Sequence, residues 1–295
     1  MIDVIMQQLV AGLSVGSVLL LVAIGLSLTF GQMGVINMAH GEFIMIGAYT
    51  TFTIQQILGS AGLSLLISIP AAFLVGGVLG IVLEQVLIRH LYNRPLDTLL
   101  ATFGVGLILQ QVARDIFGAP AVDVRAPEWM RGNSELFGTT IPTSRVFILV
   151  LALCAVVALG AFMTKTPQGR RIRAVVLNRD LAETNGVNTR ATDRLTFFIG
   201  SGLAAVAGVA VTQIGATGPT IGQNFIVDAF LVVAAGGIGK IKGAVIAAFV
   251  LGVLQAFIEY STGASIAKFL ILVIIVAFLQ FRPQGLFQVR TRSLV

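Results

Sequence analysis

Apolar stretches long enough to cross a membrane alternate with short polar segments along almost the whole chain. A helix that spans a bilayer needs roughly 20 mostly apolar residues, and shorter runs indicate broken or re-entrant helices. The candidate spans cover residues 6–30, 43–58, 63–88, 97–117, 146–164, 195–214, 224–237, 243–260 and 266–281. The pattern therefore predicts an all-α polytopic membrane protein with about 8–10 transmembrane helices, folded as one domain over residues 1–295.

Two polar interruptions predict broken helices inside this apolar sequence. Residues 31–42 interrupt the apolar run from 4 to 58, and residues 215–228 lead into the short 224–237 segment. Backbone that leaves helical geometry at membrane depth must be buried in protein or line a water-filled path. Short pieces bounded by Gly and Pro are typical of transport sites. The substrate-pathway candidates are Asn37, His40, Glu42, Thr217, Gln223, Asn224 and Asp228.

Each interruption also has a simpler interpretation. The first would be an ordinary cytoplasmic turn whose polar side chains are solvated. In the second, Asp228 would cap a helix N-terminus, where a carboxylate is favourable by about 0.3–1 kcal/mol. Capping and a pathway role do not exclude each other.

The composition excludes several classes of function. Charged residues make up only 11% of the chain, where a soluble domain carries about a quarter. The net charge of +6 is spread over loops, so it does not indicate a nucleic-acid partner. One Cys and two His support neither a metal site nor a catalytic constellation, and residues 236–240 fail the phosphate-binding loop pattern because Ile241 follows Lys240. The chain is expected to be no enzyme and to bind no cofactor.

The distribution of basic residues predicts the orientation in the membrane. The polar loop 165–194 carries seven Lys and Arg against three Asp and Glu, a net +4, and such an excess marks a cytoplasmic loop. Loop 118–145 balances its charges and is expected outside, as is the N-terminus. Basic residues also mark as cytoplasmic the 89–96 turn, the Lys240/Lys242 turn and the Arg282/Arg290/Arg292 tail.

Within loop 165–194, residues 177–186 have the pattern of a short surface helix. Asn178 is placed to cap it, acidic residues fall in its early turns, and Gly186 ends it. Such a helix between two spans suits docking against a soluble protein. The simpler interpretation is a solvated connector that only sets the topology.

Small residues also recur four positions apart, which lets membrane helices approach closely. This spacing indicates tight helix packing, either within one subunit or at a dimer interface. The pairs are Gly12/Gly16, Gly76/Gly80, Ala204/Gly208 and Gly239/Gly243.

Four motifs, in order along nearly the whole chain, resemble one family of membrane proteins. They are GVINMAHGEF at 34–43, RAVVLNRDLAETNGVN at 173–188, the glycine motif at 236–239 with 243–244, and FRPQGLF at 281–287. Together they are similar to the branched-chain amino acid-type permeases of bacterial ABC importers. Residues 94–104 with Gln110 and Gln111, and residues 217–228, look closer to the urea-importing branch of that family.

The resemblance implies a multi-pass permease of the bacterial inner membrane that imports urea, with ATP and Mg used by partner subunits. The implied partners are a second permease subunit (a paralogue or a second copy of this chain), two cytoplasmic ATPase subunits, an external substrate-binding protein that lands on loop 118–145, and membrane lipid. The coupling loop 165–194 would place its 178–190 helix in a cleft of the ATPase. Three arginines would anchor this helix while Ala182 and Gly186 permit close approach; the implied coupling residues are Arg173, Asn178, Arg179, Ala182, Gly186, Asn188 and Arg190.

The substrate remains open between two chemistries. Urea is small, neutral and planar, so its pathway needs uncharged polar partners. A branched-chain amino acid needs charge complementarity for the zwitterion and a hydrophobic cup, and its import, or that of short amides, is the nearest alternative. A passive urea or water channel would need no ATPase-docking loop, and an ion-coupled transporter would need buried charge along several spans.

Overall fold

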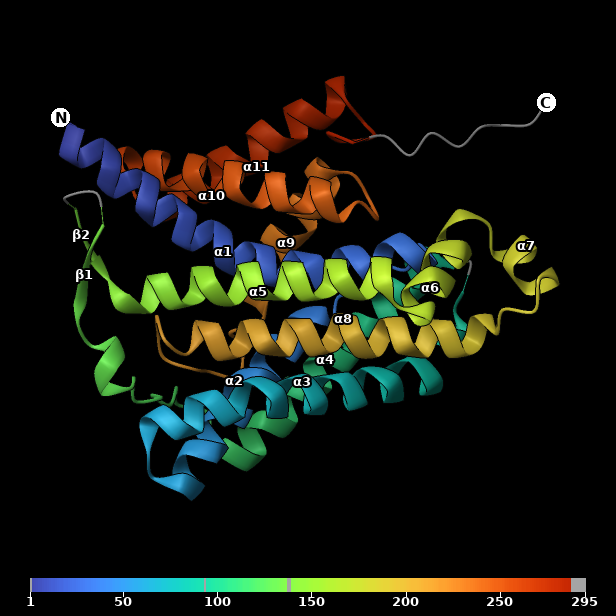
Figure 1. The fold of residues 1–295 in the computed structure, drawn as a ribbon, viewed down its shortest axis with the longest axis horizontal. Coiled ribbons are helices and arrows are strands. Elements are labelled where there is room, and N and C mark those ends of the chain that lie inside the picture. Colours follow the sequence, from blue (N-terminus) through green and yellow to red (C-terminus); the bar gives the residue numbers. More distant parts are fainter. Residues whose placement is uncertain (1, 93, 137–138, 288–295) are drawn as a thin grey trace.

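The computed structural model describes residues 2–92, 94–136 and 139–287, and it is a bundle of helices (Figure 1). Each predicted span has one helix: α1 (Ile2–Met33), α2 (His40–Leu58), α3 (Ala61–Val86), α4 (Pro95–Phe117), α5 (Thr143–Lys165), α8 (Thr189–Val211), α9 (Gln223–Gly236), α10 (Ile241–Thr262) and α11 (Ala264–Phe281). The prediction of an all-α polytopic membrane protein is thereby confirmed. Seven of these helices in the described ranges are long and apolar enough to cross a membrane unaided, and α2 and α9 are not among them.

Short elements connect the long helices at the two ends of the bundle. Two of them are 3-10 turns, η1 (Ile88–His90) and η2 (Glu128–Met130), and two are short α-helices, α6 (Pro167–Leu177) and α7 (Arg179–Thr184). Strands β1 (Asn133–Leu136) and β2 (Thr139–Pro142) form an antiparallel hairpin that pairs Asn133 with Pro142. In Figure 1 the hairpin and the N-terminus lie at one end of the bundle, and α6 and α7 lie at the other.

The core of the bundle is built around α1 and α8. Residues 20–24 of α1 have no exposed surface, and almost every residue of α8 from Thr196 to Val211 is buried. Around this pair, α10 packs on α1, and α2 and α3 pack on α8. Helices buried on all sides have little need of an amphipathic pattern, so their polar residues stand out as candidates for internal contacts.

The predicted small-residue pairs serve packing within this one chain. A Cβ atom added at Gly12 would lie 2.4 Å from the Cα of Val253 in α10, and one at Gly80 would lie 2.4 Å from the Oγ of Ser201 in α8. A Cβ atom added at Gly208 would lie 2.0 Å from the carbonyl oxygen of Ile44 in α2. The alternative that these pairs form a dimer interface is therefore not needed to explain them.

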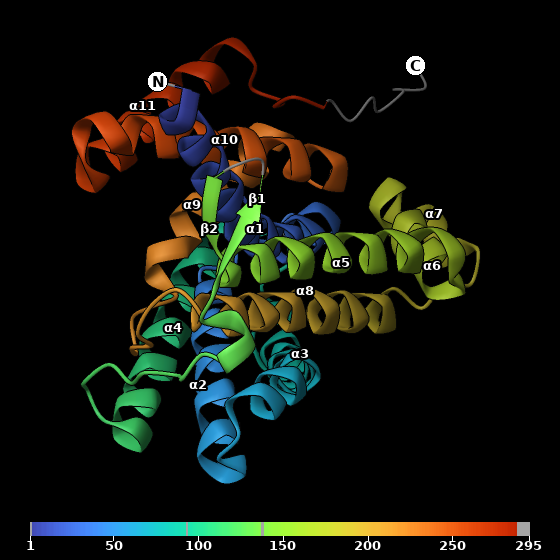
Figure 2. The same cartoon turned by 60° about the vertical axis from the view of Figure 1, so that its left-hand side comes forward.

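The 34–39 loop returns the chain from the end of α1 into the middle of the bundle. His40 Nε2 lies 3.2 Å from the carbonyl oxygen of Val22, eleven residues before the end of α1, which is about 17 Å along a helix. A Cβ at Gly25 would touch both His40 and Gly200, the midpoint of α8. Helix α2 therefore begins at mid-depth, and it runs steeply across the direction of α5 and α8 (Figure 2).

Residues 212–222 make the corresponding return from the other end of the bundle. They lead back from the end of α8 to the start of α9, which lies beside the first turn of α2. Helix α9 ends near the end of α1, where a Cβ atom added at Gly31 would lie 2.2 Å from the Cα of Gly239. The predicted broken helices are thus two half-helices. One runs from mid-depth toward the hairpin end, and the other runs from mid-depth toward the α6–α7 end.

The basic segments gather at the α6–α7 end. Arg179 of α7 lies over the ring of Tyr92, from the 89–96 turn, and the 237–242 turn contacts both the end of α1 and Phe287. Loop 118–145 lies at the hairpin end, where Gln55 exchanges hydrogen bonds with the backbone of Arg125. This segregation agrees with the predicted orientation. Arg290 and Arg292 lie outside the described residues.

Candidate translocation site and coupling segment

The two half-helices meet at their N-termini through a pair of glycines. A Cβ at Gly41, in the first turn of α2, would lie 2.7 Å from the carbonyl oxygen of Gly222, and one at Gly222 would lie 2.1 Å from that of Gly41. Only glycine allows backbones this close. Neither N-terminus is capped by a side chain. Two positive helix-dipole ends therefore converge at the middle of the bundle.

Three of the predicted pathway residues surround this point and are buried. Asn37, His40 and Glu42 are 1%, 0% and 3% exposed, so the interpretation of residues 31–42 as a solvated cytoplasmic turn is wrong. Neither polar atom of the Asn37 side chain has a hydrogen-bond partner, nor does His40 Nδ1 or Glu42 Oε2, within the described part of the chain. Unpaired buried polar groups are costly, and they cluster where a ligand or water completes the bonding.

A small cavity opens beside Glu42. Gln110 of α4 donates a hydrogen bond to Glu42 Oε1 at 2.8 Å. Gln223, at the start of α9, lines the same cavity. Its volume is about 30 Å³, close to the space of one water molecule. The remaining lining is mainly apolar: Met38, Phe103, Gly106, Leu107 and Ile226.

The other predicted pathway residues lie elsewhere. Thr217 is buried, and its backbone forms two 2.8 Å hydrogen bonds with Val122 of the 118–145 loop. Asn224 and Asp228 lie on the side of α9 that faces α11, where Lys268 Nζ is 3.7 Å from the carboxylate of Asp228. Asp228 is five residues into α9, so the interpretation of it as an N-cap is wrong.

Two residues of these clusters were not among the predicted site residues. Gln110 lies in α4, and the apolar pattern of this helix does not indicate that the Gln110 amide faces inward. The neighbouring Gln111 is exposed and donates a hydrogen bond to Asp115. Lys268 lies near the start of an apolar span. A lysine there is typically anchored at the membrane surface, so its position does not indicate a partner inside the chain. A partner 40 positions away for Asp228 is not visible in local sequence.

The short helix in the polar loop matches its prediction closely. Asn178 Oδ1 accepts a 2.9 Å hydrogen bond from the backbone N–H of Leu181 at the start of α7. Gly186 adopts φ +79° and ends the helix, with Val187 N–H bonding back to the carbonyl of Ala182. Asn188 then caps α8 by accepting from Ala191 N–H at 3.0 Å. The loop is therefore an ordered helix–turn–helix arrangement.

Arg179 is bound inside the chain, which corrects its predicted availability to an ATPase. Its guanidinium makes a two-pronged contact with the Asp193 carboxylate, with Nη2–Oδ2 at 2.6 Å and Nη1–Oδ1 at 3.3 Å. Asp193 has no exposed side-chain surface and also accepts from Gln32 of α1 at 2.9 Å. Thr196 of α8 donates to Gln32 in turn. The hydrogen bond to Asp193 raises the pKa of Arg179 further, so α7 is tied to α1 and α8 by a permanent charge.

Tyr92 extends this tie to α3. The Arg179 guanidinium carbon lies 5.6 Å from the centre of its ring, within cation–π range, and its hydroxyl donates to Glu84 at 2.9 Å. Burial, together with the nearby carboxylates, raises the pKa of Tyr92 well above its usual range, which keeps the phenol a donor. The α7 anchor is therefore linked to α8 directly, to α1 through Asp193 and Gln32, and to α3 through Tyr92 and Glu84.

The remaining coupling candidates differ in what they offer a partner. Ala182 is 5% exposed and packs inward, so its predicted role of permitting close approach by the ATPase is wrong. Arg173, Gly186 and Arg190 are exposed, and no atom lies within 4 Å of a Cβ built on Gly186. The prediction overlooked Leu177 and Leu181.

Leu177, at the end of α6, and Leu181, in α7, are exposed apolar residues of the polar loop. They are 80% and 60% exposed, on a segment that lies outside every candidate span. Exposed apolar residues that cluster away from lipid mark interaction surfaces. No sequence rule separated them from buried leucines, because two leucines four positions apart are equally typical of a core-facing stripe.

These features define the class of protein. Long apolar helices, two half-helices that meet at a buried polar site, and an anchored helix on the basic end are the parts of a multi-pass membrane transport permease. No group of side chains that could hold a metal ion occurs among residues 2–287 as described.

The comparisons with known proteins identify the family. The branched-chain amino acid transport system permease component family matches residues 8–279, and the chain belongs to it. The high-affinity branched-chain amino acid transport system permease protein LivH of Salmonella typhimurium is 35% identical over 289 residues, covering 92% of this chain and 93% of LivH. BraD of Pseudomonas aeruginosa, with the corresponding description, is 33% identical over 95% of both chains. No solved structure matches the chain.

Membership confirms several predictions. The chain is a transport subunit and not an enzyme, it is a multi-pass protein of the inner membrane, and ATP is used by partner ATPases. The family resemblance read from the four motifs is confirmed as well.

Proposed function

We propose that this chain is the permease subunit of an ABC importer for branched-chain amino acids. The observation behind the proposal is the family match over residues 8–279, with relatives that bear this substrate in their names. Two ATPase subunits, a second permease subunit and an external binding protein would complete the importer. Urea, which two sequence segments favour, has no support among the named relatives.

The chemistry at the meeting point of α2 and α9 suits an amino acid. Paired helix N-termini favour a carboxylate, and broken transport helices use them in that way. Glu42 Oε2 has no partner and offers an acceptor for the ammonium group. Met38, Phe103 and Leu107 provide an apolar wall for the side chain. The cavity of about 30 Å³ is closed to a substrate of this size, which would enter when α4 separates from α2 and α9.

The test is uptake of radiolabelled leucine into proteoliposomes that hold the chain with its co-purified partner subunits, ATP and binding protein. Unlabelled isoleucine and valine are expected to compete, while urea is not. Glu42→Gln should lower leucine uptake at least tenfold, while Glu259→Gln, at an exposed site on α10, should not change it. ATP-driven uptake of urea without leucine uptake would overturn the proposal.

Urea import is the second candidate function. It is favoured by two buried amide side chains, Asn37 and Gln110, which could bond a neutral polar substrate. Labelled urea in the same proteoliposomes distinguishes it. Urea uptake that needs no ATP would instead indicate a passive channel.

We further propose that α7 couples the spans to the ATPase. Leu177 and Leu181 would enter an apolar pocket of the ATPase, with Arg173 and Arg190 at its polar rim. Movement of α7 would pass through Arg179 and Asp193 to α8, and through Gln32 to α1. The anchoring role first assigned to Arg179 is thus an internal one.

Gly186 offers a direct test of this docking. A Cβ atom at 186 has open space around it in this chain, and a Trp side chain there would obstruct a partner. Because φ is +79° there, Gly186→Asn is the matched control, since Asn tolerates that conformation. The Trp variant is expected to hydrolyse ATP without uptake and the Asn variant to remain coupled. Normal uptake by the Trp variant would exclude docking at this position.

A further inference from the structure

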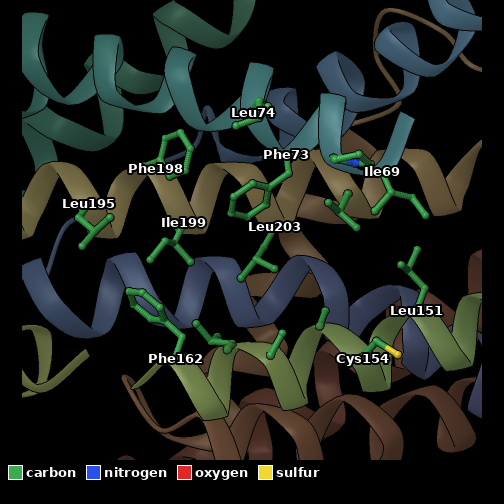
Figure 3. Close-up of a pocket in the computed structure, with 15 residues that line it drawn as sticks. Ile69, Phe73, Leu74, Leu151, Cys154, Phe162, Leu195, Phe198, Ile199 and Leu203 are labelled. Carbon is green, nitrogen blue, oxygen red and sulfur yellow. The ribbon is translucent and has the colours of Figure 1, made fainter. Parts of the chain in front are cut away.

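A long apolar cleft runs between α3, α5 and α8 on the outside of the bundle. Its volume is about 750 Å³, and side chains of all three helices converge in it (Figure 3). Phe73 of α3, Phe198 and Leu203 of α8, and Phe162 of α5 form its walls. All three helices are long and apolar enough to span the membrane, so the medium outside this cleft is lipid hydrocarbon.

The length of the cleft is close to the depth of one membrane leaflet. It extends on α5 from Leu151 to Phe162 and on α8 from Leu195 to Val206, so its end residues are eleven positions apart on each helix, or about 17 Å. The hydrocarbon core is about 30 Å thick, so one leaflet is about half of that. On α8 the cleft is centred on Gly200, the midpoint of that helix, and its Leu195 end lies on the side where α5 finishes at Lys165, which is the predicted cytoplasmic side. A chain that enters at Leu195 from the inner leaflet would therefore reach past mid-depth.

A polar cavity adjoins the cleft and shares Leu195 with it as a lining residue. It has a volume of about 220 Å³ and is lined by Leu195 together with Gln168, Arg171, Asn188, Ala191 and Thr192. None of these described lining residues is acidic. The neighbouring sequence from 165 to 179 adds further Lys and Arg without a carboxylate. The cytoplasmic leaflet is anionic, and basic pockets between spans on that side bind anionic headgroups.

We propose that the joined cleft and cavity form a binding site for one anionic glycerophospholipid of the inner leaflet. An acyl chain would lie between α3 and α5 on the surface of α8. The phosphate would be held by the Arg171 guanidinium, with Gln168 as a further donor. The occupant is amphipathic because the site is: an apolar slot of leaflet depth ends in a cationic polar cavity through the shared Leu195.

The test is photo-crosslinking of phosphatidylglycerol with a diazirine in its acyl chain, in nanodiscs that hold the chain with its partner subunits. Mass spectrometry should map cross-links to residues 151–162 and 195–206. Arg171→Gln should reduce them about fivefold, the factor expected for one Arg at an anionic surface. The control Arg170→Gln, exposed on the same helix, should not.

A second pair of variants separates site loss from misfolding. Ala158→Phe fills the cleft and should remove the cross-links, while Val157→Phe, next to it and 69% exposed outside the cleft, should keep them. Unlabelled phosphatidylglycerol should compete and phosphatidylethanolamine should compete weakly. Competition by inorganic phosphate alone would overturn the acyl-chain slot. Capture of a second permease subunit by a cross-linker on Cys154, which lines the cleft, would show a protein occupant and overturn the proposal.

Discussion

Replacing Asp193 with alanine tests the tie between α7 and the bundle most directly. The carboxylate is fully buried and accepts two hydrogen bonds from Arg179 and one from Gln32. Removing one partner of a buried pair costs about 3–5 kcal/mol. Arg179 is 37% exposed and regains water when released, which screens part of that loss. We therefore expect about 2 kcal/mol, or a roughly 30-fold larger population of detached α7.

Two measurements check this value. Hydrogen exchange of the backbone amides in residues 179–187 should accelerate by the same factor, since exchange reports local opening. Leucine molecules transported per ATP hydrolysed should fall, because movement of α7 no longer reaches α1 and α8. Asp180→Ala, which removes an exposed carboxylate on the same helix, is the control and should change neither quantity.

A double variant separates the ion pair from helix packing. Arg179→Met with Asp193→Leu replaces both partners by apolar groups, which often restores stability at a buried pair. Exchange of α7 should therefore return toward the wild-type rate. Wild-type exchange and coupling in Asp193→Ala alone would refute the reasoning, because the carboxylate would then hold nothing.

Three further predictions concern the meeting point and the exposed Leu181. Gly222→Ala should destabilise the protein by about 1–3 kcal/mol through backbone overlap and lower its melting temperature, whereas Gly160→Ala, with open space around it, should leave the temperature equal or higher. Glu42→Gln keeps an amide in place of the carboxylate, so it should retain the melting temperature but lower leucine uptake at least tenfold; equal uptake would exclude Glu42 from substrate binding. Leu181→Ser should weaken co-purification with the ATPase without changing the melting temperature, and undiminished co-purification would show that Leu181 lies outside the interface.

The spans and breaks of this fold could be predicted because bilayer thickness imposes them on the sequence. The length of each apolar stretch predicted one long helix. The capping pattern at Asn178 and Gly186 predicted the ends of α7 to within two residues. The two interruptions were located by the same reasoning, since polar residues inside apolar sequence need burial in protein. These features depend on local sequence alone.

The pairing across the bundle could not be predicted, because it depends on which helix faces lie together. Gln32 and Asp193 are 161 positions apart, and nothing near either residue indicates the other. The same limit applies to Gln110 beside Glu42. It also misled the assignment of Asn224 and Asp228, which share a polar segment with Gln223 but lie on another face of α9. A helix turns about 100° per residue, so neighbours in sequence need not serve one site.

The central helix α1 is synthesised first, long before the helices that bury it. The helix is complete at Met33, yet its largest packing partner, α10, ends 229 residues later at Thr262. At roughly 5–20 residues per second, α1 spends on the order of ten to fifty seconds in the membrane before that surface exists. The helix must therefore be stable in lipid by itself. Its polar residues Ser17, Ser27 and Gln32, which are buried in the finished protein, enter the membrane before the residues that later surround them. The most central helix of the finished protein is therefore the one that spends the longest time in the membrane without its main packing partner.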